Sequence, residues 1–311
     1  MSIILRTEHL TKVYGPLIAV NNLCLEINAG DIMGFIGPNG AGKTTTIKMI
    51  ATLLRPTSGT AYVNDMNVLE HPTEVRRMIG YMPDFFGVYD DVKTWEYLDF
   101  FATAYKIPSH KRKRTIDNVL ELTDLMGKRD EFVEALSRGM KQRLCLAKTL
   151  LHDPAVLLLD EPASGLDPRA RIDIKELLKE LKSMGKTILI SSHILPELAD
   201  FCNKVAIIER GELIVSGDVA EIMEKARGGK LLELRLVDRF EDAITMLSEM
   251  QNIRSVKQED GILRIQYTGE PDQQYEILTA LVSSGFKVQS FCEAQIDLED
   301  IFMKVTTGAV A

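Results

Sequence analysis

The first two thirds of the chain alternate short apolar runs with amphipathic helical patterns. Four runs are rich in aliphatic residues and bounded by charges, namely DIMGFIG (31–37), AVLLLDEP (155–162), KTILISSH (186–193) and NKVAIIERG (203–211). Runs of this length and composition are typical of strands buried on both faces of a parallel sheet. Helical stretches such as RIDIKELLKELKSMG (171–185) connect them. We therefore predict an α/β sheet with helices on both faces.

A long helical stretch interrupts this alternation. From Lys93 to Asp130 the periodicity stays helical, which is too long for a single crossover between strands. We predict a helical subdomain over about 93–150. Within it, we interpret the basic run Lys111–Arg114 as a solvated helix face rather than a nucleic-acid patch, because the chain as a whole is acidic.

The last third of the chain has a different pattern. The segment KARGGK (225–230) has the composition of a linker. After it, the apolar positions alternate in the order strand, helix, strand, strand, helix, strand, which is the β-α-β-β-α-β order of a ferredoxin-like module. We predict a small α+β domain at 225–311 after a first domain at 1–224. The closing DLEDIFMKVT (297–306) is predicted to form a short amphipathic helix.

Composition narrows the class of protein. A chain of 311 residues with 45% hydrophobic and 26% charged residues is typical of a globular protein with two domains. The net charge of −8 argues against a nucleic-acid partner. The four cysteines are scattered, as in reduced cytosolic proteins. We expect no signal peptide, and no apolar run approaches the ~20 residues that span a bilayer. Any action at a membrane would therefore need a partner.

A glycine-rich loop carries the strongest chemical signal. GPNGAGKTT fits the pattern G-x-x-x-x-G-K-[ST] between a predicted strand and a predicted helix. Backbone N–H groups of such a loop wrap a polyphosphate, and the helix N-terminus adds partial positive charge. Lys43 is placed to reach the β- and γ-phosphates of ATP, and the Thr44 hydroxyl to ligate Mg²⁺. The predicted nucleotide-binding residues of the loop are Gly37, Pro38, Asn39, Gly40, Ala41, Gly42, Lys43, Thr44 and Thr45.

Two carboxylates end the apolar run VLLLDEP (156–162). Asp160 is placed to hold Mg²⁺ through water, as in other phosphoryl-transfer sites. Glu161 follows directly and is suited to act as general base toward the attacking water. A carboxylate pair at a strand end is a weak signal alone, but it becomes strong downstream of a phosphate loop.

These motifs resemble those of ATP-binding-cassette ATPases. Tyr14 in KVYG, the phosphate loop, LSRGM, LLLDEP, SGLD and SSH occur in the order and spacing of that family, and the likeness covers about Ile3–Val219. The resemblance implies a RecA-like core with a helical subdomain and an antiparallel β arm. It also implies an ATP hydrolase.

The resemblance assigns further roles. Tyr14 is similar to the aromatic residue that stacks on adenine, and His193 to the histidine that contacts the γ-phosphate. In this family two cassettes pack head to tail, so Ser137 and Gly139 of LSRGM would serve the γ-phosphate bound by the other subunit. Asp167 would communicate across that interface. The implied partner is a second copy of the chain or a paralogous cassette.

Three positions depart from the family pattern. The usual signature is Leu-Ser-Gly-Gly-Gln, but here Arg138 replaces the first glycine and Met140 the glutamine. We expect the charge of Arg138 to assist at the phosphate. Asp84 stands where the family usually places a Mg²⁺-ligating glutamine, and it can still bind a hard cation. These changes bear on the rate of turnover rather than on ATP binding.

The leading functional hypothesis is the ATPase subunit of an exporter. VKTWEYLDFFATAYKI (92–107) and the C-terminal ending resemble the subfamily that works with separately encoded membrane permeases. Such a subunit would lie on the cytoplasmic face of the plasma membrane. Two alternatives stay open, namely a catalytically weak regulatory cassette and a soluble ATPase outside transport. The transported substrate cannot be inferred from these residues.

Overall fold

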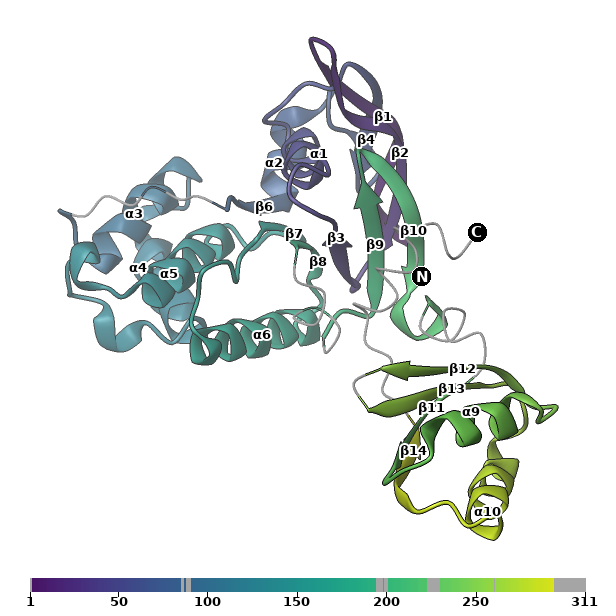
Figure 1. Ribbon diagram of the computed structural model, residues 1–311. Helices are drawn as coiled ribbons and strands as arrows, with labels where there is room; N and C mark the ends of the chain where they lie inside the picture. Colours follow the sequence, from purple (N-terminus) through teal and green to yellow (C-terminus); the bar gives the residue numbers. More distant parts are fainter. Residues whose placement is uncertain are drawn as a thin grey trace. The chain divides into compact units, whose positions relative to one another are not determined.

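The computed structural model describes residues 2–84, 87, 91–193, 198, 201–222, 230–259 and 261–293 (Figure 1). The chain divides into two compact units, Met1–Val219 and Ala220–Ala311. The boundary predicted after residue 224 and most of the predicted linker fall within 223–229, which lie outside the described residues. The predicted closing helix at 297–306 lies outside them as well.

A six-stranded sheet forms the centre of the first unit. Its strands are β3 (Ile32–Ile36), β6 (Ile79–Met82), β7 (Val156–Asp160), β8 (Thr187–Ser192), β9 (Lys204–Glu209) and β10 (Glu212–Asp218). Their order is β10-β9-β3-β8-β7-β6; neighbours from β9 to β6 run parallel, and β10 is antiparallel to β9. The four apolar runs predicted as parallel strands are confirmed. β6 was not predicted, because a strand this short leaves little periodicity.

Layers cover both faces of this sheet, which explains why every residue of β3, β7 and β8 is buried. Helix α1 (Lys43–Ile50) contributes Ile47 to the same hydrophobic cluster as Leu189 of β8. On the opposite face, Ile174 of α6 (Pro168–Ser183) and Ile190 of β8 line one small cavity. Since Leu189 and Ile190 are successive residues of one strand, the two helices lie on opposite faces.

A second, antiparallel sheet forms the predicted β arm. It has the order β2-β1-β4-β5, with β1 (Ile3–Tyr14), β2 (Leu17–Asn28), β4 (Ser58–Val63) and β5 (Met66–Asn67). Helix α2 (Pro72–Met78) follows β5 in the chain. Leu5 and Leu10 of β1 belong to the same cluster as Phe35 of β3, so the arm and the parallel sheet share one core.

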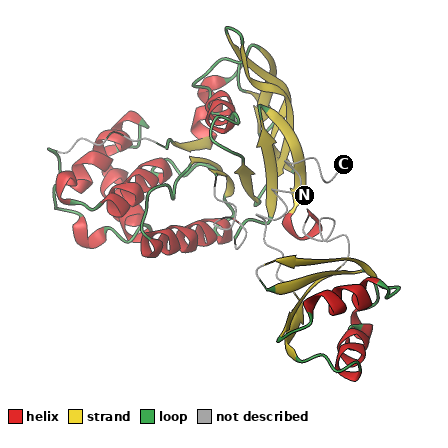
Figure 2. Cartoon of the chain, in the orientation of Figure 1, coloured by secondary structure: helices red, strands yellow, loops and turns green. Residues whose placement is uncertain are grey.

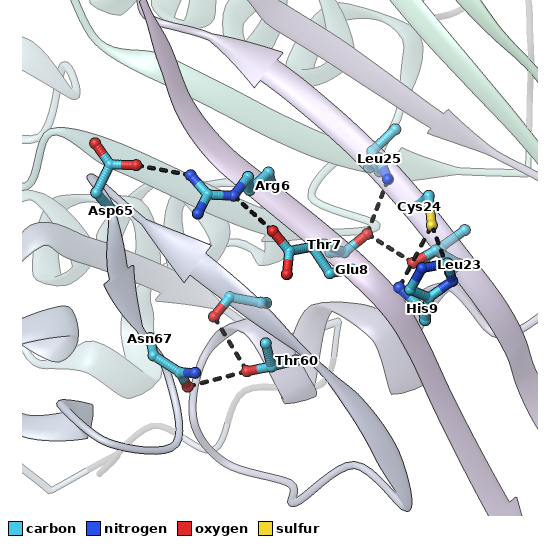
Figure 3. A network of polar contacts seen from close by, with 11 residues as sticks. Arg6, Thr7, Glu8, His9, Leu23, Cys24, Leu25, Thr60, Asp65 and Asn67 are labelled. Atoms are coloured by element: carbon cyan, nitrogen blue, oxygen red, sulfur yellow. Dashed lines mark hydrogen bonds and ion pairs between the residues drawn. The ribbon is translucent and has the colours of Figure 1, made fainter.

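Side chains also join neighbouring strands of the arm (Figure 3). The Thr7 hydroxyl donates to the Leu23 carbonyl oxygen at 2.9 Å and accepts from the Leu25 N–H at 2.9 Å. The Arg6 guanidinium lies 2.7 Å from Asp65, which follows β4. The Thr7 contacts lie where the register of β1 against β2 shifts between Thr7 and Leu10. The Arg6 contact joins β1 to the turn after β4.

The predicted helical subdomain contains three helices that pack on one another. They are α3 (Thr94–Ala104), α4 (Ser109–Leu122) and α5 (Arg138–Leu150), with short 3₁₀ turns at Met126–Lys128 and Val133–Ala135. Figure 1 shows them as one group. The basic run Lys111–Arg114 lies on α4, whose buried side chains are Ile116, Val119 and Leu120. The run itself is exposed or half-exposed, as expected of a solvated face.

The second unit has the predicted ferredoxin-like order. Its elements are β11 (Lys230–Leu236), α9 (Phe240–Ser248), β12 (Ile253–Glu259), β13 (Ile262–Tyr267), a 3₁₀ turn at Pro271–Gln273, α10 (Tyr275–Ser283) and β14 (Val288–Glu293). The sheet order is β12-β13-β11-β14, and all neighbours are antiparallel. Both helices pack on the same side of this sheet (Figure 2), around a core that includes Leu234, Leu247 and Leu281. In the part of the chain that the structure describes, no helix is long and apolar enough to cross a bilayer.

Candidate active site

Residues 37–42 join the end of β3 to the start of α1, and the motif continues to Thr45 in the first turn of that helix. Gly42 precedes the helix with φ +106°, and a Cβ there would lie 2.4 Å from the Ala19 carbonyl oxygen of β2. A Cβ on Gly37 would lie 2.3 Å from the Ile208 carbonyl oxygen of β9. Both positions therefore require glycine. The close approach of backbone to backbone holds the loop at the N-terminus of α1, where N–H groups favour an anion.

Lys43 occupies the first position of α1, and its side chain is only 6% exposed. Its ammonium donates to the Gly37 carbonyl oxygen at 2.7 Å and to the Pro38 carbonyl oxygen at 3.3 Å. Glu161 Oε1 lies 3.4 Å from the same Nζ atom. A buried ammonium needs such partners. The contacts place the positive charge between the loop and the end of β7.

Asp160, the last residue of β7, is 1% exposed. Its Oδ1 accepts from the Ser191 hydroxyl at 2.7 Å. Its Oδ2 is also buried but has no hydrogen-bond partner among the described residues. A buried carboxylate oxygen without a donor is costly unless a cation or ordered water satisfies it. The carboxylate therefore fits a divalent metal ion that binds oxygen ligands.

Glu161 follows Asp160 and has a left-handed backbone, with φ 50°. Its N–H donates to the Ser191 hydroxyl at 2.9 Å. Its carboxylate is 12% exposed and lies between two nitrogen groups: Oε1 faces Lys43, and Oε2 lies 2.8 Å from His193 Nδ1. This arrangement holds a proton acceptor in a fixed place, as a general base requires.

Asp84 follows β6 and brings a third carboxyl group to the site. Burial raises the pKa of Asp84, the charges of Asp160 and Glu161 raise it further, and the charges of Arg138 and His193 oppose them. The carboxylates repel one another, and a divalent cation would offset this repulsion. Asp84 and Asp160 thus fit the metal prediction.

Tyr81 of β6 lies near the same carboxylates, and its pKa is raised. Burial, followed by the charges of Asp160 and Asp84, raises the pKa of the Tyr81 phenol to about 12. Its hydroxyl is buried without a hydrogen-bond partner among the described residues. The phenol is protonated at neutral pH and is a buried hydrogen-bond donor without an acceptor among the described residues.

An open pocket of about 410 Å³ brings most of the predicted residues together. It joins the end of the β arm, the phosphate loop and the ends of β6, β7 and β8. Tyr14 is 45% exposed at its edge, so its ring is available for stacking. The lining residues are Tyr14, Leu17, Ala19, Asn39, Gly40, Ala41, Gly42, Lys43, Thr44, Thr45, Asp84, Glu161, Ser164 and His193.

Ser164 of SGLD lines this pocket, but Ser137, Gly139 and Asp167 do not. Ser137 caps α5 by accepting from the Met140 N–H at 3.3 Å, and Gly139 packs against Ala170. Asp167 caps α6, accepting from the Ala170 N–H at 2.9 Å. None of Ser137, Gly139 and Asp167 is among the described lining residues. Their roles at a second subunit's site therefore stay predictions.

Two residues that support the site were not predicted from the sequence. Ser191 is fully buried and links Asp160 to Glu161, and Gln142 of α5 donates to the Pro162 carbonyl oxygen at 2.6 Å. A serine inside the apolar run KTILISSH was a usable signal, because a buried hydroxyl needs partners. Gln142 offered no comparable signal, because its target is a backbone atom distant in sequence.

Together, the glycine-rich loop, the buried lysine and the carboxylates at adjoining strand ends define a P-loop nucleoside triphosphatase. The ABC transporter family model matches residues 20–164, and a model for the C-terminal domain of DrrA1-3-like ATP-binding proteins matches residues 217–306. The bacitracin transport ATP-binding protein of Bacillus licheniformis is 38% identical over 99% of both chains. The daunorubicin/doxorubicin resistance ATP-binding protein of Streptomyces peucetius is 33% identical over 97% of this chain and 92% of that protein.

Solved structures agree. The ATP-binding subunit of an ABC transporter matches with a TM-score of 0.64 and 29% identity, covering 71% of this chain and 92% of that one. A dimeric cassette bound to ADP and Pi in a post-hydrolysis state matches with a TM-score of 0.63 and 25% identity, over 70% of this chain and 99% of that one. The chain belongs to the ABC transporter ATP-binding proteins, among those of exporter type. It binds and hydrolyses ATP.

Proposed function

We propose that this chain powers export through a separately encoded membrane permease, as one of two cassettes that close head to tail on ATP. The observation that carries the catalytic part is the placement of Glu161 between Lys43 and His193. The relatives named for bacitracin transport and for daunorubicin/doxorubicin resistance support export. The permease would hold the chain at the inner face of the plasma membrane.

Each side chain at the pocket has a distinct task in this proposal. Tyr14 stacks on adenine, while the loop N–H groups and Lys43 bind the β- and γ-phosphates. Glu161 accepts the proton of the attacking water, and His193 orients Glu161 and faces the γ-phosphate. Thr44, Asp84 and Asp160 would hold Mg²⁺, which supplies charge neutralisation at the phosphates.

The composite site rests on the residues outside the pocket. Within one chain, Ser137 and Gly139 at the start of α5 do not line the described pocket. The N-terminus of α5 is nevertheless suited to bind an anion. A second copy, or a paralogous cassette, would bring its own start of α5 to the phosphate bound here. The dimeric cassette bound to ADP and Pi supports this arrangement by likeness.

Substitution of the base tests the proposal. Glu161→Gln keeps the side-chain volume but removes the proton acceptor, so we expect ATP hydrolysis to fall about 10²–10⁴-fold while ATP binding survives. Unhydrolysed ATP should then hold two chains together, which light scattering with Mg-ATP detects. Glu176→Gln is the matched control, because that exposed residue of α6 pairs only with Lys179 among the contacts described for it. A Glu161→Gln protein that binds ATP but stays monomeric would contradict the dimer.

A further inference from the structure

The turn after β7 contains two residues with a left-handed backbone, Glu161 at φ 50° and Gly165 at φ +67°. A left-handed conformation costs free energy for a glutamate and persists only when surrounding contacts hold it. The Ser164 N–H donates to the Glu161 carbonyl oxygen at 3.0 Å and closes the turn. The backbone at Glu161, from which the catalytic side chain extends, therefore depends on the turn 161–165.

Two side chains on one face of α5 donate hydrogen bonds to this segment. Gln142 is 2% exposed and donates to the Pro162 carbonyl oxygen at 2.6 Å. One helical turn earlier, Arg138 Nη2 donates to the Ser164 carbonyl oxygen at 3.2 Å. Residues four apart lie on the same face of a helix, so the two side chains act side by side. They attach α5 to both ends of the turn that follows Glu161.

Gly165 is shaped to receive Arg138. A Cβ built on Gly165 would lie 2.2 Å from Arg138 Nη2 and 2.5 Å from its Cζ. The guanidinium thus lies directly against the glycine backbone, although the arginine as a residue is exposed. The expected role of Arg138 at the phosphate stays a prediction. Within its own chain, Nη2 donates to the turn after Glu161, and the guanidinium has further N–H donors.

We propose that Arg138 is a positioning residue for Glu161 of its own chain. Its guanidinium bonds the turn 161–165 to the start of α5, and Gln142 bonds the same turn one helical turn further along α5. The signature segment then has a second task beside its role toward the partner subunit. Movement of the start of α5 is transmitted to the general base of the same chain through a hydrogen bond.

Hydrogen exchange on the full chain tests the attachment directly and requires neither nucleotide nor a dimer. In Arg138→Ala, the amides of residues 163–167 should exchange about threefold to tenfold faster, because one charge-assisted hydrogen bond to the turn is lost. Arg138→Lys should restore part of the protection, since an ammonium can donate to the same carbonyl oxygen. The matched control is Arg143→Ala on the same helix, where the side chain pairs with Asp124 at 2.8 Å. Unchanged exchange in Arg138→Ala would overturn the proposal.

Steady-state kinetics separates positioning from mere loss of stability. Arg138→Ala should lower kcat about tenfold and leave KM for ATP unchanged, because a misplaced base slows chemistry without weakening nucleotide binding. Arg138→Lys should recover part of kcat. A change confined to KM would contradict a role at Glu161.

A mixed dimer decides whether Arg138 acts on its own chain, and this test alone rests on the proposed head-to-tail function. Pair a Lys43→Ala chain with a chain of intact Lys43, using two affinity tags for purification. The remaining active site then uses Glu161 of the intact chain and the signature of the Lys43→Ala chain. Arg138→Ala should lower activity when it is placed in the intact chain and not when it is placed in the Lys43→Ala chain. The opposite result would overturn the proposal.

A separate mixture checks the dimer itself. Lys43→Ala and Ser137→Arg are each expected to be inactive, and mixing them should restore partial activity through one intact composite site. If mixing restores no activity, the head-to-tail dimer is contradicted. The hydrogen-exchange result would still decide whether Arg138 holds the turn. The two hypotheses can therefore fail separately.

Discussion

The two compact units bury different kinds of side chain. In the first unit the buried polar and charged residues include Asp31, Lys43, Asp160 and Ser191. Among the described residues of the second unit, the buried set is aliphatic or aromatic, with the Tyr267 hydroxyl as its polar atom. Both units have dense cores, so burial alone does not distinguish them. They differ in how much polar chemistry each core contains.

This difference shows which unit contains destabilising features. Buried charges and a left-handed glutamate lower stability, and they persist where function needs them. The buried residues described for the second unit are almost entirely apolar, as expected of a structural or regulatory module. Its described residues offer no counterpart to the site at Lys43 and Glu161. Catalysis should therefore be sensitive to polar changes in the first unit and insensitive to packing changes in the second.

The largest effect is expected from Lys43→Ala. The ammonium is the buried cation that bridges the phosphate loop and Glu161, and loss of one preorganised group of this kind lowers turnover about 10²–10³-fold. ATP affinity should fall as well, which isothermal titration with Mg-ATP measures. Lys48→Ala on the exposed face of α1 is the control. Wild-type turnover in Lys43→Ala would contradict the prediction that this loop binds the phosphates of ATP.

A smaller loss is expected from Ser191→Ala. The hydroxyl donates to Asp160 and accepts from the Glu161 N–H, so its removal leaves two buried groups without a partner. We expect kcat to fall about 10–100-fold and the free energy of unfolding to drop by about 1–3 kcal/mol. Steady-state kinetics and urea denaturation measure the two effects. Ser183→Ala, at an exposed hydroxyl of α6, should change neither.

The smallest effect on activity is expected from Leu281→Ala in the second unit. Leu281 is fully buried on α10, so its truncation should destabilise that unit by about 2–5 kcal/mol while turnover stays at the wild-type rate. Trp95 is the single tryptophan and lies on α3, so its fluorescence follows the first unit, whereas far-ultraviolet circular dichroism follows both. Only the dichroism should show an earlier urea transition. Val282→Ala, at a 58% exposed neighbour, is the control. An equal shift of Trp95 fluorescence would mean that the units unfold together.

The sequence predicted elements with strong periodicity and motifs that are contiguous in the chain. The runs at 31–37 and 155–162 became parallel strands, and the phosphate loop came to lie beside Glu161. Contacts between distant segments were not predictable in the same way. The contact of Arg138 with the Ser164 carbonyl oxygen was not predicted, because the distance between α5 and Ser164 is a property of the folded chain. A polar side chain that bonds to a backbone atom cannot be predicted from the residue types, because every residue has a backbone carbonyl oxygen.

The order of strands in the parallel sheet has a consequence for synthesis on the ribosome. β3 leads directly into the phosphate loop, yet Ile32 pairs with Ile188, and Met33 pairs with Lys204. Pairings this remote in sequence are slow to form and cannot begin before the later strands emerge. The nascent chain must therefore hold an apolar strand unpaired through most of translation. Chaperone contacts during that interval would protect the region that later binds ATP.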